Sequence, residues 1–138
     1  MKTIEGDLLD IADGIICHQV NCQRRAGAGL ALAISKKYPL WYQHFVAVPP
    51  HLGDVDVFWL NPHLRIASLF AQNRYGRVGK FTDYPAFDCC LGGLKLDIGR
   101  APVYFPYGIG CGLAGGDWDI VEAMIEKHFP NATIVKKV

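Results

Sequence analysis

Apolar segments of strand length alternate along this chain with segments of helical periodicity, and this alternation constrains the fold more than any other feature. Residues 14–20 form an apolar, β-branched run. Residues 28–38 follow with apolar side chains spaced three and four apart, which places them on one helix face. Further strands are expected at Lys2–Glu5, 54–60, 64–71, 101–106 and 132–135, and helices at 41–48, 84–98 and, with Asp117 as N-cap, up to about residue 129. Such alternation predicts a three-layer α/β/α domain around a mixed, largely parallel sheet of about six strands.

The bulk composition fits one globular domain and narrows its partners. We assign residues 1–138 to a single domain, because the chain shows no repeat and no low-complexity linker. A hydrophobic fraction of 51% suffices for a core without metals or disulfides. The formal net charge of +1 argues against duplex nucleic acid or an anionic membrane as partner, but not against a small anionic ligand. A modest basic cluster is balanced by acidic residues elsewhere, so nucleic-acid binding ranks low; it comprises Arg65, Arg74, Arg77 and Lys80.

The five cysteines indicate a reduced protein. Their number is odd, no secretory segment precedes the first acidic residues, and no apolar run is long enough to span a bilayer. We therefore expect a cytoplasmic monomer without a membrane partner. Cys17, His18 and Cys22 have a spacing that could suit a metal, but no second pair follows, so neither a metal nor another cofactor is expected.

A first glycine-containing loop, residues 21–30, runs from a predicted strand into a predicted helix. Gly27 and Gly29 allow the backbone to approach a ligand without Cβ obstruction, and the free amides of the following helix would point at an anion. No Lys-Ser/Thr pair follows the glycines, which argues against a nucleoside triphosphatase loop. The pattern fits an ordinary strand-to-helix turn equally well.

A second loop, residues 107–116, carries five glycines, at 108, 110, 112, 115 and 116. Ordering so many glycines costs conformational entropy, and a turn needs only one or two. Successive exposed amides can form a nest that binds an anion. Because both loops follow predicted strands, they should meet at the edge where parallel strands end, as a two-sided clamp on a diphosphate.

The order of several short motifs resembles that of a macrodomain. The motifs are Gly6-Asp7-Leu8-Leu9, the HQVNCQ run at 18–23, the GAGLA run at 27–31, Lys37-Tyr38-Pro39 and the GIGCGLAGGDW run at 108–118. Residues 72–84 are also similar to those of bacterial and phage members. The branch that the chain resembles includes phage and yeast ADP-ribose 1″-phosphate phosphatases and the terminal ADP-ribose–protein glycohydrolase. The resemblance implies a macrodomain fold, with ADP-ribose or a derivative as ligand and ADP-ribosylated macromolecules as partners.

The resemblance also implies roles for individual residues. Asp7 would contact the adenine amine with Leu8 beside it, and Asn21 would face the distal ribose. The first phosphate would contact Gly27, Ala28, Gly29 and Leu30, and the second phosphate and distal ribose would contact Ile109, Gly110, Cys111, Gly112 and Leu113. From position alone, Asp7 would instead cap the turn that follows it.

The resemblance favours hydrolysis of ADP-ribose 1″-phosphate to ADP-ribose and phosphate. Asn21 would orient the distal ribose or the attacking water, and Asp117 is the carboxylate close in sequence to the second loop, although helix capping also explains it. His18 fits a core histidine, and Cys111 fits a small loop residue. Two alternatives remain: a reader that binds ADP-ribose without turnover, and a mono-ADP-ribosyl hydrolase that acts on modified protein or nucleic acid by a substrate-assisted route.

The chain departs from the family pattern at two places. The glycohydrolase branch uses a lysine and an aspartate where this chain has Gln72 and Ala114, so a lysine-adduct mechanism is unsupported. Many relatives have a Gly-Val-Met-like stretch where this chain has Arg24-Arg25-Ala26. The two arginines could meet a terminal phosphate on the distal ribose, or they could be solvated surface residues.

Overall fold

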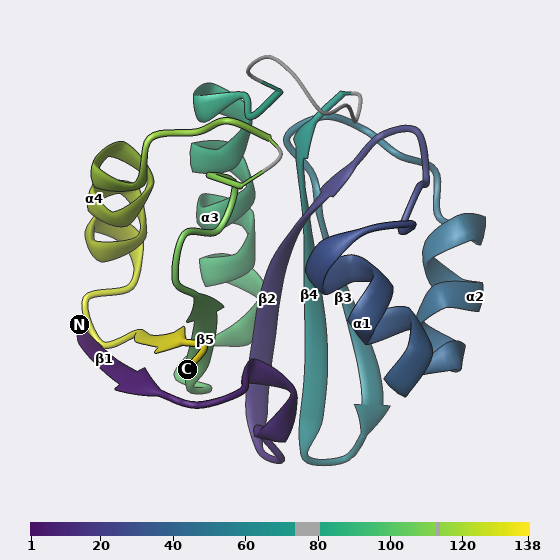
Figure 1. Ribbon diagram of the computed structural model, residues 1–138, viewed down its shortest axis with the longest axis horizontal. Coiled ribbons are helices and arrows are strands. Elements are labelled where there is room, and N and C mark those ends of the chain that lie inside the picture. Colours follow the sequence, from purple (N-terminus) through teal and green to yellow (C-terminus); the bar gives the residue numbers. More distant parts are fainter. Residues whose placement is uncertain (74–80, 113) are drawn as a thin grey trace.

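A computed structural model describes residues 1–73, 81–112 and 114–138, and it shows one six-stranded sheet between two pairs of helices (Figure 1). The strand order is β1-β6-β5-β2-β4-β3, and only β3 runs antiparallel to its neighbour. The strands are β1 (Lys2–Glu5), β2 (Gly14–Asn21), β3 (Val55–Asn61), β4 (Leu64–Gln72), β5 (Val103–Pro106) and β6 (Thr133–Lys136). The predicted mixed, largely parallel sheet is confirmed.

Two helices cover each face of the sheet, which confirms the predicted three layers (Figure 1). On one face lie α1 (Gly29–Lys37) and α2 (Pro39–Ala47), and on the other lie α3 (Tyr84–Ile98) and α4 (Trp118–His128). A short 3-10 helix, η1 (Leu8–Asp10), links β1 to β2. Pro39 begins α2, because a proline is accommodated in the first helical turn but not in the interior of a helix.

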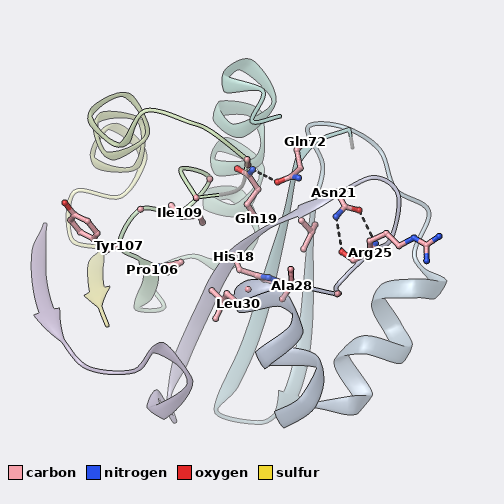
Figure 2. A pocket seen from close by; sticks show the side chains of 18 residues that line it. His18, Gln19, Asn21, Arg25, Ala28, Leu30, Gln72, Pro106, Tyr107 and Ile109 are labelled. Carbon is pink, nitrogen blue, oxygen red and sulfur yellow. Dashed lines mark hydrogen bonds between the residues drawn. The ribbon is translucent and has the colours of Figure 1, made fainter. Parts of the chain in front are cut away.

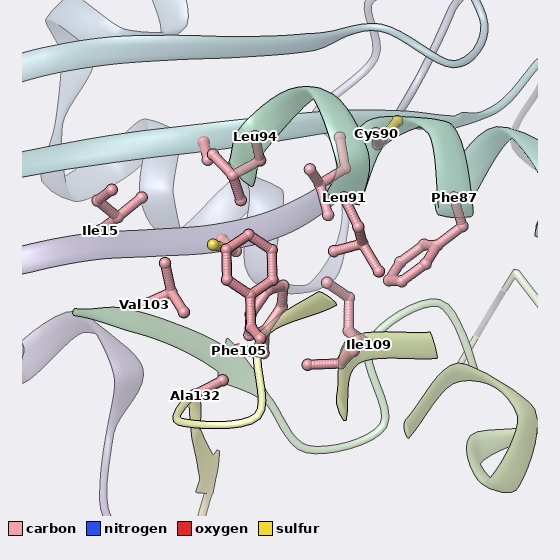
Figure 3. Close-up of a cluster of buried hydrophobic side chains, with 14 of the residues drawn as sticks. Ile15, Phe87, Cys90, Leu91, Leu94, Val103, Phe105, Ile109 and Ala132 are labelled. Atoms are coloured by element: carbon pink, nitrogen blue, oxygen red, sulfur yellow. The ribbon is translucent and has the colours of Figure 1, made fainter. Parts of the chain in front are cut away.

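The core has one part on each face of the sheet. Beneath α3 and α4, large apolar side chains such as Phe87, Leu91 and Phe105 are fully buried (Figure 3). Beneath α1 and α2, the rings of Trp41 and Phe45 stack at 4.9 Å. Each part buries enough apolar surface to hold its helix pair, and the loops at the strand ends are therefore built on a fixed frame.

The helices differ in how they begin. Asp83 caps α3 by accepting a hydrogen bond from the Ala86 amide at 2.9 Å, and Asp117 caps α4 by accepting from the Asp119 amide at 2.9 Å. The predicted capping role of Asp117 is thus confirmed. Ala28 precedes α1 and makes no side-chain capping bond, since its side chain has no acceptor.

Several sequence-based expectations concern residues outside the described part of the chain. These are Arg74, Arg77 and Lys80 of the basic cluster and Leu113 of the second glycine loop. Among the described residues, no helix is long and apolar enough to cross a membrane, and no group of three or more His, Cys, Asp or Glu side chains could hold a metal ion. The five cysteines are free thiols.

Candidate functional site

A cavity of about 700 Å³ opens where β2, β4 and β5 end (Figure 2). The chain leaves β2 toward α1 on one face of the sheet and leaves the neighbouring β5 toward α4 on the other face. Open α/β sheets bind ligands at such a topological switch point. The volume also lies within the usual range for small-molecule sites.

The cavity wall comes from three strand ends and two loops. We call residues 22–28, between β2 and α1, loop 1, and residues 107–117, between β5 and α4, loop 2. The described lining residues are His18, Gln19, Val20, Asn21, Arg25, Gly27, Ala28, Gly29, Leu30, Ala31, Gln72, Pro106, Tyr107, Gly108, Ile109, Gly110, Gly112 and Ala114. Both predicted glycine loops therefore meet across one cavity, as the sequence indicated.

Asn21 shapes loop 1. Its side-chain oxygen accepts hydrogen bonds from the amides of Gln23 and Arg25, each at 3.1 Å, and its Nδ2 donates to the Arg25 carbonyl at 2.9 Å (Figure 2). The residue is buried and lines the cavity. Both polar atoms of the Asn21 side chain thus bind the backbone of loop 1. The predicted contact between Asn21 and the distal ribose stays a prediction and would be a second role of the same side chain.

The two arginines of loop 1 have different surroundings. Arg24 has a left-handed backbone, with φ of 59°, and its Nη1 donates to the Val46 carbonyl near the end of α2 at 3.3 Å. Arg25 is exposed and lines the rim of the cavity. Figure 2 shows its guanidinium extended away from His18 and Gln19. The predicted contact with a terminal phosphate therefore stays a prediction for Arg25 alone, since Arg24 is tied to α2.

The first turn of α1 faces the cavity with its amides uncapped. Gly29, Leu30 and Ala31 line the wall, and Ala28 supplies no side-chain acceptor. The amides of a first helical turn have no acceptor within the helix, and the helix dipole adds partial positive charge there. Gly29 has φ of +58°, a conformation that favours glycine. The start of α1 is therefore suited to bind an anion.

Loop 2 is anchored at Gly110. Its carbonyl accepts hydrogen bonds from Thr82 Oγ1 at 2.6 Å and from the Gly116 amide at 2.8 Å. Its φ is +75°, a backbone conformation that L side chains rarely adopt, so glycine is favoured at this position. Gly112 differs, because it lines the cavity and a Cβ there would meet no atom within 4 Å. Loop 2 is thus fixed at Gly110, and its backbone at Gly112 is open to the cavity.

Gln19 and Thr82 tie loop 2 to the sheet, and sequence reasoning missed both. Gln19 Nε2 donates to Gln72 Oε1 at 2.7 Å (Figure 2) and to Thr82 Oγ1 at 2.9 Å. One signal for Gln19 was available in the sequence. Gln19 and Asn21 lie two positions apart in β2, so their side chains are expected on the same face of the strand, at its end. Nothing in the sequence pairs Gln19 with Thr82, because the two lie 63 positions apart.

Four of the residues expected to act in the site do not line the cavity. Asp7 is exposed and caps η1, with its Oδ1 accepting from the Leu9 amide at 2.9 Å. Leu8 is buried in the small apolar cluster around Ile16. Asp117 is exposed at the start of α4. Cys111 donates its thiol hydrogen to the Ile109 carbonyl at 3.3 Å, and desolvation by burial raises the pKa of the thiol, which disfavours the nucleophilic thiolate.

The other predicted binding residues that the structure describes lie in the cavity wall. They are Asn21, Gly27, Ala28, Gly29, Leu30, Ile109, Gly110 and Gly112. The wall also contains His18, which is 1% exposed and whose Nε2 lies 2.9 Å from Ser68 Oγ. Burial lowers the pKa of His18 to about 3, so its imidazole is neutral near neutral pH. The expectation of a buried core histidine is confirmed, although His18 also borders the cavity.

The lining residues determine which chemistry the cavity wall can support. Among the described lining residues there is no carboxylate. The polar groups are backbone amides and the side chains of two glutamines, one asparagine, one tyrosine, one arginine at the rim and a neutral histidine. Such a wall can donate many hydrogen bonds to an anion. A protein carboxylate that could act as general base is absent from the described wall.

Comparisons with known proteins identify the fold. No family model matches the chain. An uncharacterized 17.5 kDa protein from the tk-vs intergenic region of Enterobacteria phage T4 is 27% identical over 150 residues, which cover 98% of this chain and 94% of that protein. A protein of unknown function from Bacteroides thetaiotaomicron has a similar structure, with a TM-score of 0.83, 27% identity and coverage of 99% of this chain and 97% of that one.

Two further structures carry descriptive names. The macrodomain of Mycobacterium tuberculosis DarG superposes with a TM-score of 0.82 at 22% identity, covering 99% of this chain and 95% of that one. This chain has the macrodomain fold. Thermosipho africanus DarTG, solved in complex with ADP-ribose, shares the macrodomain fold with a TM-score of 0.79 at 15% identity, covering 99% of this chain and 42% of that one. The macrodomain architecture expected from the sequence is confirmed.

Proposed function

We propose that the cavity binds ADP-ribose or a derivative of it, with the diphosphate held between loop 1 and loop 2. The observation that carries the proposal is the uncapped first turn of α1, which faces a second glycine loop across one cavity. Backbone amides on two sides suit a diphosphate, because each phosphate can accept hydrogen bonds from its own loop. The structure of Thermosipho africanus DarTG in complex with ADP-ribose, of which 42% superposes on this chain, supports the choice of ligand.

Binding is the activity that the described wall supports most directly. It requires amide donors and a shaped cavity, and both are present. A binding protein of this kind would recognise ADP-ribose free in solution or attached to a macromolecule. Such a reader requires no general base.

Hydrolysis of ADP-ribose 1″-phosphate is the second candidate, and it uses the same amides. Donors from two loops can stabilise the charge that develops on phosphoryl oxygens, which is a major part of phosphoryl-transfer catalysis. Without a carboxylate in the described wall, the attacking water would depend on orientation by the wall and on the substrate's own phosphates. Removal of ADP-ribose from a modified macromolecule by a substrate-assisted route would also require the wall and the substrate's phosphates to orient the attacking water.

Two measurements on the purified protein test these functions. Calorimetric titration with ADP-ribose, with adenosine as the comparison ligand, tests binding; no heat of binding from ADP-ribose would contradict the proposal. Release of inorganic phosphate from ADP-ribose 1″-phosphate tests the phosphatase. Tight binding with no phosphate release over hours would leave the reader and the ADP-ribosyl hydrolase, and assays on auto-modified acceptors would separate those two.

A further inference from the structure

His18 is a buried polar residue in the cavity wall for which the proposed function has no role. It lies on β2, is 1% exposed and packs edge-on against the Trp41 ring at 5.0 Å. It also lines the cavity, as do Ala28 and Leu30 at the start of α1 (Figure 2). His18 therefore contacts the core and also belongs to the cavity wall.

The hydrogen bonds around Ser68 determine which ring nitrogen of His18 carries the proton. Ser68 Oγ accepts from Trp41 Nε1 at 3.1 Å, since an indole nitrogen can only donate. The hydroxyl still has its own proton, and His18 Nε2 lies 2.9 Å away. When Ser68 donates this proton to Nε2, the neutral imidazole must carry its single hydrogen on Nδ1.

The opposite tautomer satisfies fewer groups. If Nε2 carried the hydrogen, Ser68 would accept from both rings, and neither its proton nor Nδ1 would have a partner among the described residues. Burial keeps the imidazole neutral by lowering the pKa of His18 to about 3, so the doubly protonated form does not compete near neutral pH. The Nδ1–H form therefore has the better hydrogen-bond balance.

In that form, Nδ1–H is a buried donor without an acceptor. Nδ1 has no hydrogen-bond partner in the described part of the chain, although it is almost completely removed from solvent. A buried donor that lacks a partner is costly, and most such groups in folded proteins are satisfied. Because His18 belongs to the cavity wall, a small movement of the side chains that cover Nδ1 would allow a bound ligand to supply the acceptor.

We propose that His18 is a ligand-binding residue, whose Nδ1–H donates a hydrogen bond to a phosphate oxygen of the bound nucleotide beside the first turn of α1. The inference rests on the proposed function, because it assigns a side-chain contact within the same site. A phosphate oxygen suits the position, since His18 lines the same cavity as the uncapped first turn of α1, and no carboxylate competes in the described wall. Ser68 is then a positioning residue that fixes the donor tautomer.

Nitrogen NMR of histidine-labelled wild-type protein tests the inference without a variant. Near neutral pH, the free protein should show a neutral His18 with the hydrogen on Nδ1. Saturation with ADP or ADP-ribose should shift the Nδ1 resonance strongly, and adenosine, which lacks a phosphate, should not. A proton on Nε2, or a shift that requires the distal ribose and is absent with ADP, would overturn the inference.

A pair of variants adds a readout of affinity. His18→Phe keeps an aromatic ring beside Trp41 and removes the donor, so the dissociation constant for ADP-ribose should rise about ten-fold or more. Phe45→Leu is the matched control, because it disturbs the same buried cluster without reaching the cavity, and its affinity should stay within two-fold of the wild type, roughly the scatter expected for an independent site. Equal losses in both variants would overturn the inference.

The outcomes separate the two proposals. If wild-type protein binds ADP-ribose while the Nδ1 resonance stays unchanged, the assignment of His18 is wrong and the proposed function stands. If wild-type protein does not bind ADP-ribose at all, the proposed function is wrong and the assignment of His18 falls with it.

Discussion

The start of α1 and the starts of α3 and α4 each have first-turn amides without acceptors inside the helix, but the three helices use these amides differently. Asp83 and Asp117 each accept a hydrogen bond from the first turn of their own helix, at 2.9 Å. Ala28 leaves the first turn of α1 without a side-chain acceptor, and this turn is the one that lines the cavity. Asp83 and Asp117 therefore satisfy amides of their own helices, whereas the first turn of α1, which lines the cavity, leaves its amide donors available to a ligand.

The largest effect is expected from blocking the space opposite α1. Gly112→Glu places a carboxylate in the cavity, where it would repel a diphosphate and occupy its volume, so ADP-ribose affinity should fall about a hundred-fold or more. The fold should tolerate the change, because a Cβ at Gly112 meets no atom within 4 Å. Calorimetry and thermal unfolding measure the two quantities. Leu96→Glu, at an exposed position on α3, is the control and should leave affinity unchanged.

Giving α1 the cap that α3 and α4 possess tests the comparison itself. Ala28→Asp should raise the free energy of unfolding by about 1 kcal/mol, as N-caps usually do. The same carboxylate would occupy the first-turn amides and repel phosphate, so affinity for ADP-ribose should fall roughly ten-fold. Ala28→Ser should stabilise with a smaller loss of affinity, since it caps without charge. Unchanged affinity in Ala28→Asp would show that these amides do not contact the ligand.

Loosening loop 1 should have an intermediate effect. Asn21→Ala removes three hydrogen bonds that hold loop 1, so affinity should fall by several-fold to about ten-fold through lost pre-organisation. A role limited to shaping the loop predicts that affinity and any turnover fall together. The role expected from the family resemblance, at the distal ribose, predicts a larger loss of turnover, and single-turnover kinetics beside calorimetry distinguish these results.

The smallest effect on binding is expected at a capped helix. Asp117→Ala should lower the free energy of unfolding by about 1 kcal/mol, because α4 loses its cap. Affinity for ADP-ribose should stay unchanged, since Asp117 is exposed and does not line the cavity. Denaturant unfolding and calorimetry provide the measurements. A large loss of turnover at unchanged stability would restore Asp117 as a catalytic residue.

The sequence predicted the elements well because their signals are local. Apolar runs and helical spacing identified each described strand and α-helix to within a few residues, and the helix predicted at 84–98 has these bounds in the structure; the 3-10 helix η1 was not predicted. The convergence of the two loops was also predictable, since parallel strands end at one edge. The sheet order was not, because pairing of β2 with both β4 and β5 depends on packing between distant segments.

The sequence predicted the parts of the site that are formed by the backbone, but not the parts that depend on contacts between side chains. Glycine spacing revealed loop 1 and loop 2, whereas the network from Gln19 to Thr82 joins residues that only the fold brings together. Asp117 follows the glycines of loop 2 in sequence, and only the structure shows that it caps α4 and does not line the cavity. For His18, the apolar run indicated burial, but it could not show that the ring also borders a cavity.

Amide chemical shifts during a titration with ADP-ribose test the two-sided backbone site most directly. The amide protons of Gly29, Leu30 and Gly112 should move downfield to saturation, because each would lie against a phosphate. The amide of Asp119, capped by Asp117, should stay unchanged. Saturable binding that leaves the amides of α1 and loop 2 unmoved would contradict the site.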